Sequence, residues 1–211
     1  MLLPDEKTCL FFALIGYAAG SVLYCDLVLR AFRHTDVFRA SEDGNPGAHN
    51  AFACGGFWCG VCTLLADLGK GFVPVFLCLR KIDDLVPLFA LTLLSPVLGH
   101  AFSLFHHGRG GKAIAASFGV LLGLVPRDAL PLLLLAACYL FFSLAVVIRP
   151  HDLRSIATYL VFTLLCLALV SEAPVRVGCC LVSGVVVYKH LLPILKRQVN
   201  RNENENTDPI L

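Results

Sequence analysis

The chain alternates between long apolar runs and short polar connectors. Seven apolar segments can be drawn, at about residues 8–30, 52–79, 85–106, 112–126, 129–148, 155–171 and 174–195. Most of them reach the roughly 20 residues that a helix needs to cross a bilayer. The pattern therefore predicts an all-α, polytopic integral membrane protein with seven transmembrane helices over residues 1–199. Residues 200–211 are mostly polar and lack this pattern, so we expect a disordered tail there.

The composition agrees with a membrane protein. Apolar residues make up 57% of the 211 residues and charged residues only 15%, and the mean hydropathy is +0.77. A soluble domain is nearer a quarter charged, so the lipid bilayer is the expected surroundings. The net charge is only +2, and no basic cluster is interleaved with aromatic residues, so we expect no nucleic-acid partner. The first apolar segment follows no basic stretch and is too long for a signal peptide, which favours an uncleaved span.

The orientation follows from the connectors, because cytoplasmic loops carry an excess of Lys and Arg. Eleven basic residues fall on one side: Arg30, Arg33, Arg39, Arg109, Lys112, Arg149, Arg154, Lys189, Lys196, Arg197 and Arg201. Five fall on the other: Lys7, Arg80, Lys81, Arg127 and Arg176. We therefore expect the N-terminus outside and the C-terminus in the cytoplasm.

A glycine-rich corner separates the third and fourth apolar segments. It reads Gly108-Arg109-Gly110-Gly111, and Lys112 opens the next segment. Glycine lets backbone N–H groups approach a ligand closely, and the first N–H groups of a helix lack partners within it. Together with two cations, such a corner suits a phosphate group. A plain interhelical turn with cytoplasmic cations is the alternative.

The fourth apolar segment is short for a membrane span. From Lys112 to Pro126 it has 15 residues, or about 22 Å of helix, against a hydrocarbon core of about 30 Å. One of its ends must recede into the bilayer or be shielded by neighbouring helices. If that end is Lys112, the glycine corner lies in a recess at the cytoplasmic face, open to lipid on one side and to water on the other.

Other polar groups lie on the same side. The connector 31–50 is rich in Gly, Asn, Asp and Pro, so it is either a tightly folded loop or a second wall of a pocket. Asp67 and Lys70 lie at i and i+3, on one helix face within an apolar segment. They form either a self-contained ion pair or a pair whose lysine points into the site. The charged stretch 149–155 and the dipeptide Lys189-His190 also fall here, although loop charges are usually solvated.

Ten cysteines are present, nearly all inside apolar runs. Cys59 and Cys62 have the spacing of a redox or metal motif, but no histidine stands at zinc-finger spacing. Cysteine also packs as a small apolar residue in membrane helices. We favour packing and expect no metal and no cofactor.

Three blocks of sequence resemble the acyl-phosphate-dependent glycerol-3-phosphate acyltransferases of bacterial membranes, the PlsY family. The stretch 16–21 resembles the first helix of that family. The stretches 44–50 and 67–71 resemble its Gly-Ser-Gly-Asn-x-Gly-Ala-Thr-Asn loop and its Asp-x-x-Lys-Gly motif. The stretch 99–112 resembles its Gly-His and Lys-Gly-Gly-Lys-Gly block. Weaker matches at Ser155-Ile156 and 188–190 complete the order over almost the whole chain.

The resemblance implies transfer of a fatty acyl group from acyl-phosphate to the 1-hydroxyl of sn-glycerol 3-phosphate, at a site facing the cytoplasm and without a metal. By matched position it implies a catalytic set of Lys112, Lys70 and His100. Asp43 stands where the family has a serine, and we add it to the catalytic candidates. The substrate-binding residues implied are Asn45, Gly47, Asn50, Arg109, Gly110, Gly111 and His190.

Three positions depart from the family pattern on the acceptor side. The family's serine, arginine and asparagine there are Asp43, Ala53 and Pro193. A carboxylate about 4 Å from a phosphate costs on the order of 4 kcal/mol at an effective dielectric near 20. Three alternatives to the family reaction therefore stay open: acylation of a different hydroxyl acceptor, a non-catalytic membrane homologue, and a transporter. Paired discontinuous helices in two related halves, typical of many transporters, are not apparent.

Overall fold

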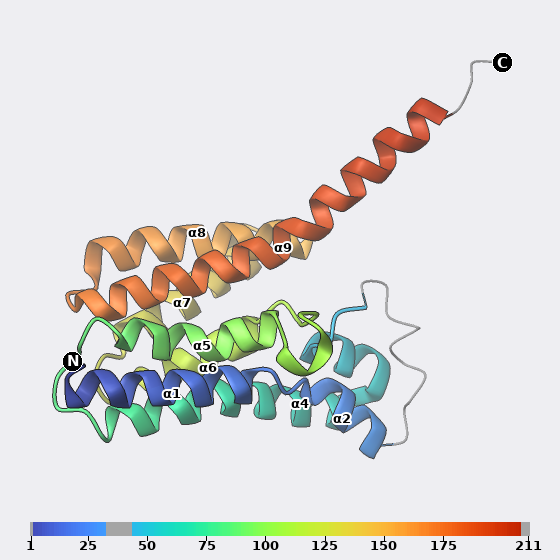
Figure 1. Cartoon of the computed structure of the whole chain (residues 1–211). Coiled ribbons are helices and arrows are strands. Elements are labelled where there is room, and N and C mark those ends of the chain that lie inside the picture. Colours follow the sequence, from blue (N-terminus) through green and yellow to red (C-terminus); the bar gives the residue numbers. More distant parts are fainter. Residues whose placement is uncertain (1, 33–43, 208–211) are drawn as a thin grey trace.

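The computed structural model describes residues 2–32 and 44–207, and within these ranges every regular element is a helix (Figure 1). The elements are α1 (Pro4–Gly20), α2 (Tyr24–Ala31), α4 (Ala48–Leu79), α5 (Phe89–Ala101), the 3-10 helix η1 (Leu104–His106), α6 (Ile114–Leu124), α7 (Leu130–Leu140), the π-helix η2 (Phe141–Ala145), α8 (His151–Leu169) and α9 (Ala173–Thr207). The all-α prediction is confirmed, and each of the seven apolar segments contains a helix or a pair of helices.

Four of the described helical stretches are long and apolar enough to cross a membrane. They are Ala48–Leu79, Phe89–His106, His151–Leu169 and Ala173–Val199, and α1 with α2 makes a fifth if the bent pair is one span. The helices Ile114–Leu124 and Leu130–Ala145 are shorter. The fourth apolar segment is thus as short as its sequence indicates, while seven complete crossings stay a prediction.

The first apolar segment is not one helix. α1 ends at Gly20, α2 begins at Tyr24, and the two axes differ by 42°. Other elements bond the backbone groups that this break releases: Ser103 Oγ donates to the Ser21 carbonyl at 2.6 Å, and Lys70 Nζ donates to the Val22 carbonyl at 2.8 Å. Irregular backbone at membrane depth is tolerated where protein groups satisfy it in this way. The break therefore depends on residues more than 40 positions away in the sequence.

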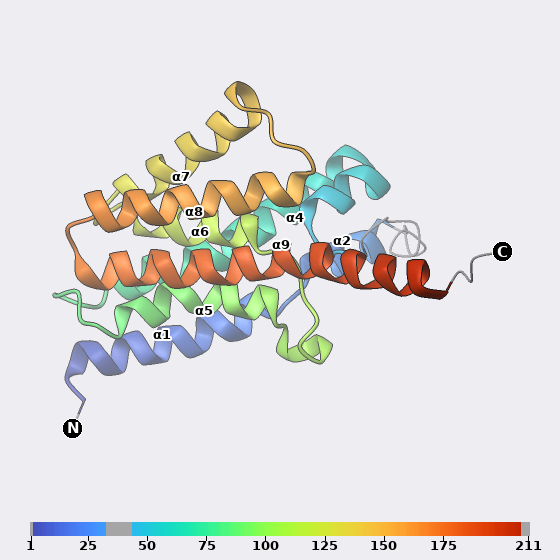
Figure 2. The same cartoon turned by 90° about the horizontal axis from the view of Figure 1, so that it is seen from above.

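Glycines bring two pairs of helices into backbone contact. A Cβ added at Gly20 of α1 would meet the backbone of Pro96 in α5, and one at Gly99 of α5 would meet the backbone of α1. Gly71 of α4 and Gly119 of α6 make the same close approach to each other's helices. Small residues at such interfaces let membrane helices pack closely. Viewed from above, α1, α5, α9 and α8 lie side by side, and α9 extends beyond the bundle (Figure 2).

Two long helices contain features that the sequence pattern does not predict. α4 bends at Gly56, whose φ of 80° and ψ of −177° are not helical, so its first turns point away from the rest of the helix. α9 continues to Thr207, through polar residues for which the sequence predicts a disordered tail. Extending a formed helix by one residue is far easier than nucleating a new one, so polar residues can follow an apolar span in helical form. The domain boundary at residue 200 stays a prediction.

Several helices begin or end at one end of the bundle, opposite the N-terminus (Figure 1). α5 ends there, and α2, α4, α6 and α8 begin there. The connectors at this end contain the glycine corner and residues 44–50.

Candidate active site

The glycine corner is tied to the end of α5. The N–H of Gly111 donates to the carbonyl of His100 at 2.9 Å. Lys189 of α9 donates from Nζ to the carbonyls of Ala101 at 2.9 Å and Gly110 at 3.1 Å. A Cβ at Gly111 would overlap the Nε2 of His100, so only glycine fits against that imidazole. The corner is thus a backbone turn anchored from two neighbouring helices.

α6 begins directly after this corner. Ala113 has a φ of 62° and a ψ of 14°, in the left-handed region, and turns the chain into the helix that starts at Ile114. The first N–H groups of α6 have no acceptor within the helix, and its macrodipole places partial positive charge there. Lys112 therefore stands at the positive end of a helix, as the sequence predicts.

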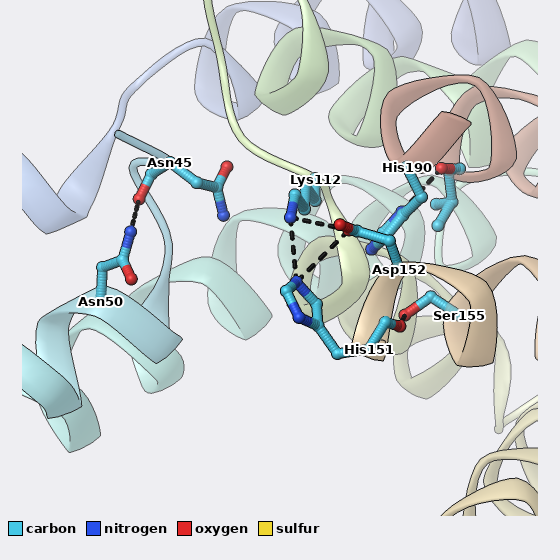
Figure 3. A network of polar contacts seen from close by, with 8 residues as sticks. Asn45, Asn50, Lys112, His151, Asp152, Ser155 and His190 are labelled. Atoms are coloured by element: carbon cyan, nitrogen blue, oxygen red, sulfur yellow. Dashed lines mark hydrogen bonds and ion pairs between the residues drawn. The ribbon is translucent and has the colours of Figure 1, made fainter. Parts of the chain in front are cut away.

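The ammonium group of Lys112 is held by the first turn of α8. Nζ donates to Asp152 Oδ1 at 2.8 Å and lies 3.0 Å from His151 Nε2 (Figure 3). Because an ammonium can only donate, Nε2 of His151 accepts. The Asp152 carboxylate is buried, with 2% of its side chain exposed. The lysine and the carboxylate come from segments forty residues apart, and they meet because α6 and α8 begin at the same end of the bundle.

A cavity of about 550 Å³ opens beside Lys112. Its polar lining comes from α4, α5, α8 and α9 and from the connectors before α4 and α6: Asn45, His49, Asp67, His100, Lys112, His151, Arg154, Ser155 and His190. Its apolar lining comes from α4, α6 and α7: Leu64, Leu68, Ile114, Phe118 and Tyr139, among others. One cavity therefore combines a polar end with an apolar wall, which suits a molecule that has a charged head and a hydrocarbon chain.

Behind the cavity, Asp67 joins a lysine and a histidine. Lys70 Nζ lies 2.8 Å from Asp67 Oδ1, and His100 Nδ1 lies 3.6 Å from the same oxygen. All three side chains are almost fully buried. Asp67 and His100 line the cavity, whereas Lys70 does not and instead bonds the Val22 carbonyl. Of the two readings of the Asp67–Lys70 pair, the structure therefore favours the ion pair, and Lys70 reaches the cavity only through Asp67.

His190 and residues 44–50 form further parts of the lining. His190 Nδ1 lies 2.8 Å from the carbonyl of Val186 (Figure 3). A carbonyl only accepts, so Nδ1 carries the proton, and the buried Nε2 has no hydrogen-bond partner among the described residues. The loop is compact: the Nδ2 of Asn50 and the N–H of Gly47 both donate to the Asn45 carbonyl at 2.9 Å. Residues 44–50 therefore form a tightly folded loop that also lines the cavity, so both alternatives for this connector hold in its described part.

The structure brings together most, but not all, of the residues that the sequence predicts for the site. Asn45, Gly47, His100, Lys112 and His190 line the cavity. Arg109 and Gly110 instead line a neighbouring hollow of about 590 Å³, which also receives Asp26, His106 and Pro46, so Arg109 does not converge with Lys112 on one cavity. Gly111 and Asn50 support the lining from behind. Asp43 lies outside the described residues.

Residues 149–155 contribute more to the cavity than a charged connector predicts. A charged connector is usually solvated, yet Asp152 is buried against Lys112, and His151, Arg154 and Ser155 line the cavity. The available signal was Pro150 followed by an acidic first turn, which is typical of a helix start.

All ten cysteines are free, and among residues 2–32 and 44–207 no group of three His, Cys, Asp or Glu side chains is arranged to hold a metal ion.

Comparison with known proteins places this geometry in context. A family model described as "Glycerol-3-phosphate acyltransferase" matches residues 10–197. Curated proteins of that name from Myxococcus xanthus (strain DK1622) and Pseudomonas aeruginosa (strain LESB58) are 38% and 36% identical over 144 and 179 residues. These matches cover 68% and 84% of this chain and 72% and 89% of those proteins. The crystal structure of PlsY (YgiH), an integral membrane glycerol 3-phosphate acyltransferase, in its glycerol 3-phosphate form, superposes with a TM-score of 0.73 at 24% identity, covering 92% of this chain and 93% of that one.

Proposed function

The chain belongs to the glycerol-3-phosphate acyltransferase family, and we propose that it moves a fatty acyl group from an acyl-phosphate to the 1-hydroxyl of sn-glycerol 3-phosphate. The observation that carries the proposal is the position of Lys112, at the start of α6 beside the glycine corner, in the wall of a cavity with a polar and an apolar end. The products would be lysophosphatidic acid and inorganic phosphate. Such an activity belongs to phospholipid synthesis.

The reaction needs alignment more than activation, because an acyl-phosphate is a mixed anhydride and already reactive. The hydroxyl oxygen attacks the carbonyl carbon, the bond from that carbon to the phosphate oxygen breaks, and the hydroxyl proton passes to the departing phosphate. The protein contributes proximity and stabilisation of the negative charge that develops on the phosphate and the carbonyl oxygen. No cofactor is required for this chemistry.

We assign the donor's phosphate to Lys112 and to the start of α6. Gly111 shapes the turn beside Lys112, because its N–H donates to the His100 carbonyl, and the phosphate contact that the resemblance implies for Gly110 stays a prediction. The acyl chain of the donor then lies along the apolar wall formed by α4, α6 and α7. The acceptor is assigned to the side formed by Asn45, Gly47, Asn50 and His190. The Nε2 of His190 is unprotonated and has no partner in the described part of the chain. His100 stands between the two substrates, and Lys70 fixes Asp67 behind it. Arg109 and Asp43 keep their expected roles as predictions.

We place the site at the cytoplasmic face of the cell membrane, with seven crossings, the N-terminus outside and the C-terminus inside. The support is that the end of the bundle with Lys112 also carries the larger share of the basic connectors. Glycerol 3-phosphate would then reach the cavity from the cytoplasm, and the acyl donor from the bilayer.

A second candidate is acylation of a different, uncharged hydroxyl acceptor. Ala53 and Pro193 stand where the resemblance implies an arginine and an asparagine. Pro193 lies within α9, one turn after His190, so this face of the helix offers a ring in place of an amide. Loss of these polar groups on the acceptor side favours an acceptor without a phosphate.

Two assays separate the candidates. Expression in a strain that lacks its own glycerol-3-phosphate acyltransferase should restore growth if the first proposal holds. Purified protein in detergent, given acyl-phosphate and either glycerol 3-phosphate or uncharged polyols, should release phosphate faster with the phosphorylated acceptor. Faster turnover with a polyol would replace the first proposal by the second, and no turnover with any acceptor would refute both.

A further inference from the structure

Among the described residues, Asp67 and Lys112 of the cavity lining each have an oppositely charged partner, whereas Arg154 has none. Asp67 is matched by Lys70 at 2.8 Å, and Lys112 is matched by Asp152 at 2.8 Å. Arg154 also lines the cavity, and it has no ion pair with any residue in the described ranges. A cation next to a low-dielectric wall is costly without a counter-charge. Because no described carboxylate pairs with Arg154, its charge suits an anion that a ligand brings into the cavity.

The guanidinium of Arg154 is held in place by an aromatic ring. Its central carbon lies 5.8 Å from the centroid of the Tyr139 ring in α7, and the Tyr139 ring meets Phe118 of α6 edge to face at 5.9 Å. Its Nε is buried and has no hydrogen-bond partner among the described residues. Arg154 also lies one helical turn after His151, which contacts Lys112. The side chain therefore lies at the border between the polar end and the apolar wall, and its N–H groups bond no other residue of the described ranges.

We propose that Arg154 is a second phosphate-binding residue of the cavity, which contacts phosphate oxygens of the acyl donor or of the acceptor. The inference rests on the proposed function for the identity of those substrates. A guanidinium presents a planar fork of N–H donors that matches two phosphate oxygens, and such charge-assisted bonds are about twice as strong as neutral ones. Stacking on Tyr139 orients that fork before the ligand arrives. Lys112 would then act on the phosphate from one side and Arg154 from the other.

The test compares Arg154→Met, Arg154→Lys and the wild type in detergent, with KM measured separately for the acyl-phosphate and for glycerol 3-phosphate. Arg154→Met should raise KM at least roughly tenfold for the substrate whose phosphate it binds, the loss expected for one charge-assisted contact. The KM for the other substrate should change less than about twofold, which identifies the phosphate concerned. Arg154→Lys keeps the positive charge but lacks the planar fork of donors, so its KM for the same substrate should lie between those of the wild type and Arg154→Met. If Arg154→Met does not accumulate, Arg154→Lys alone tests the inference.

Two controls exclude a merely structural role. Arg127→Met removes an exposed arginine that lies 3.9 Å from Glu172 at the opposite end of the bundle, and it should leave both KM values unchanged. Tyr139→Leu removes the stacking ring but not the charge, so it should raise the same KM as Arg154→Met, by a smaller factor. Unchanged KM values for both substrates in Arg154→Met, with an active wild type, would overturn the inference.

A binding measurement separates this inference from the proposed reaction. Inorganic phosphate should raise the unfolding temperature of the wild type in detergent, and the increase should be lost in Arg154→Met but kept in Arg127→Met. That result supports phosphate binding by Arg154 even if no acyl transfer is detected. Equal protection of wild type and Arg154→Met would refute it even if acyl transfer is fast.

Discussion

Removal of Lys112 should have two effects, on stability and on catalysis, and the structure allows them to be separated. At 2.8 Å the attraction between Lys112 and Asp152 is about 6 kcal/mol at an effective dielectric of 20. The loss of solvation of two nearly buried charges offsets much of it. Lys112→Met leaves the Asp152 carboxylate buried without its cation, which typically costs about 3–5 kcal/mol. Asp152→Asn alone should also lower stability, because it leaves the Lys112 ammonium without its carboxylate partner.

The double variant Lys112→Met/Asp152→Asn removes both charges together. Replacing a buried pair by neutral groups of similar volume is often neutral or stabilising, so the double variant should recover most of the lost stability. Its kcat/KM should stay at least roughly tenfold below the wild type, because one charge-assisted contact to the donor phosphate is missing. The assays are denaturant unfolding in detergent and phosphate release from acyl-phosphate.

Two results would contradict this reasoning. If Lys112→Met unfolds at the same denaturant concentration as the wild type, the pair is not a buried ion pair in solution. If the double variant turns over at nearly the wild-type rate, Lys112 does not bind the donor phosphate and the glycine corner is only a turn.

Three further predictions concern the corner and the topology. Ala113→Gly should stabilise the protein by about 1 kcal/mol, because a left-handed conformation costs an L-residue roughly 1–2 kcal/mol; a lower midpoint of unfolding would contradict this. Gly111→Ala should lower both stability and turnover by clashing with the imidazole beside it, whereas Gly69→Ala, which meets nothing within 4 Å, should be tolerated; equal tolerance would show that the contact is loose. In a cysteine-free background, a cysteine at Asp84 should react with a membrane-impermeant thiol reagent in intact cells and one at Asn204 should not, and the reverse pattern would invert the proposed orientation.

The apolar pattern was sufficient to predict the helices, because burial in lipid demands long apolar helical runs whatever the tertiary structure. The same pattern could not predict the break at residues 21–23, since the groups that satisfy it, Ser103 and Lys70, lie far away in the sequence. Gly56 looks like any other small residue of an apolar run until its φ is known. A local pattern carries local information, and the break at residues 21–23 depends on tertiary contacts.

The glycine corner could be predicted from the sequence, because it depends on local backbone properties. The partners of the charged side chains could be predicted less well, because they depend on how the helices pack. Glycines followed by a lysine at a helix start indicate an anion site without any knowledge of the fold, and Lys112 lines the cavity as expected. Asp152 and Arg154 look alike in the sequence as charges of one connector, yet among the described residues only Asp152 has an oppositely charged partner. Which charge has a partner depends on how α6, α7 and α8 approach one another. Arg109 shows the same limit, because it follows the left-handed residues His107 and Gly108 and lines the neighbouring hollow.

The two helix pairs that are in backbone contact at glycines have a consequence for how such a protein can evolve. α1 with α5 and α4 with α6 touch through backbone atoms, so those positions tolerate no larger side chain. The loop 44–50, the first turns of α8 and His190 in the middle of α9 lie outside these contacts and supply much of the polar lining of the cavity. Mutations can therefore accumulate in the recognition surface while the helix pairs that support it stay unchanged. A lineage can explore new acceptors by such changes without first losing its fold.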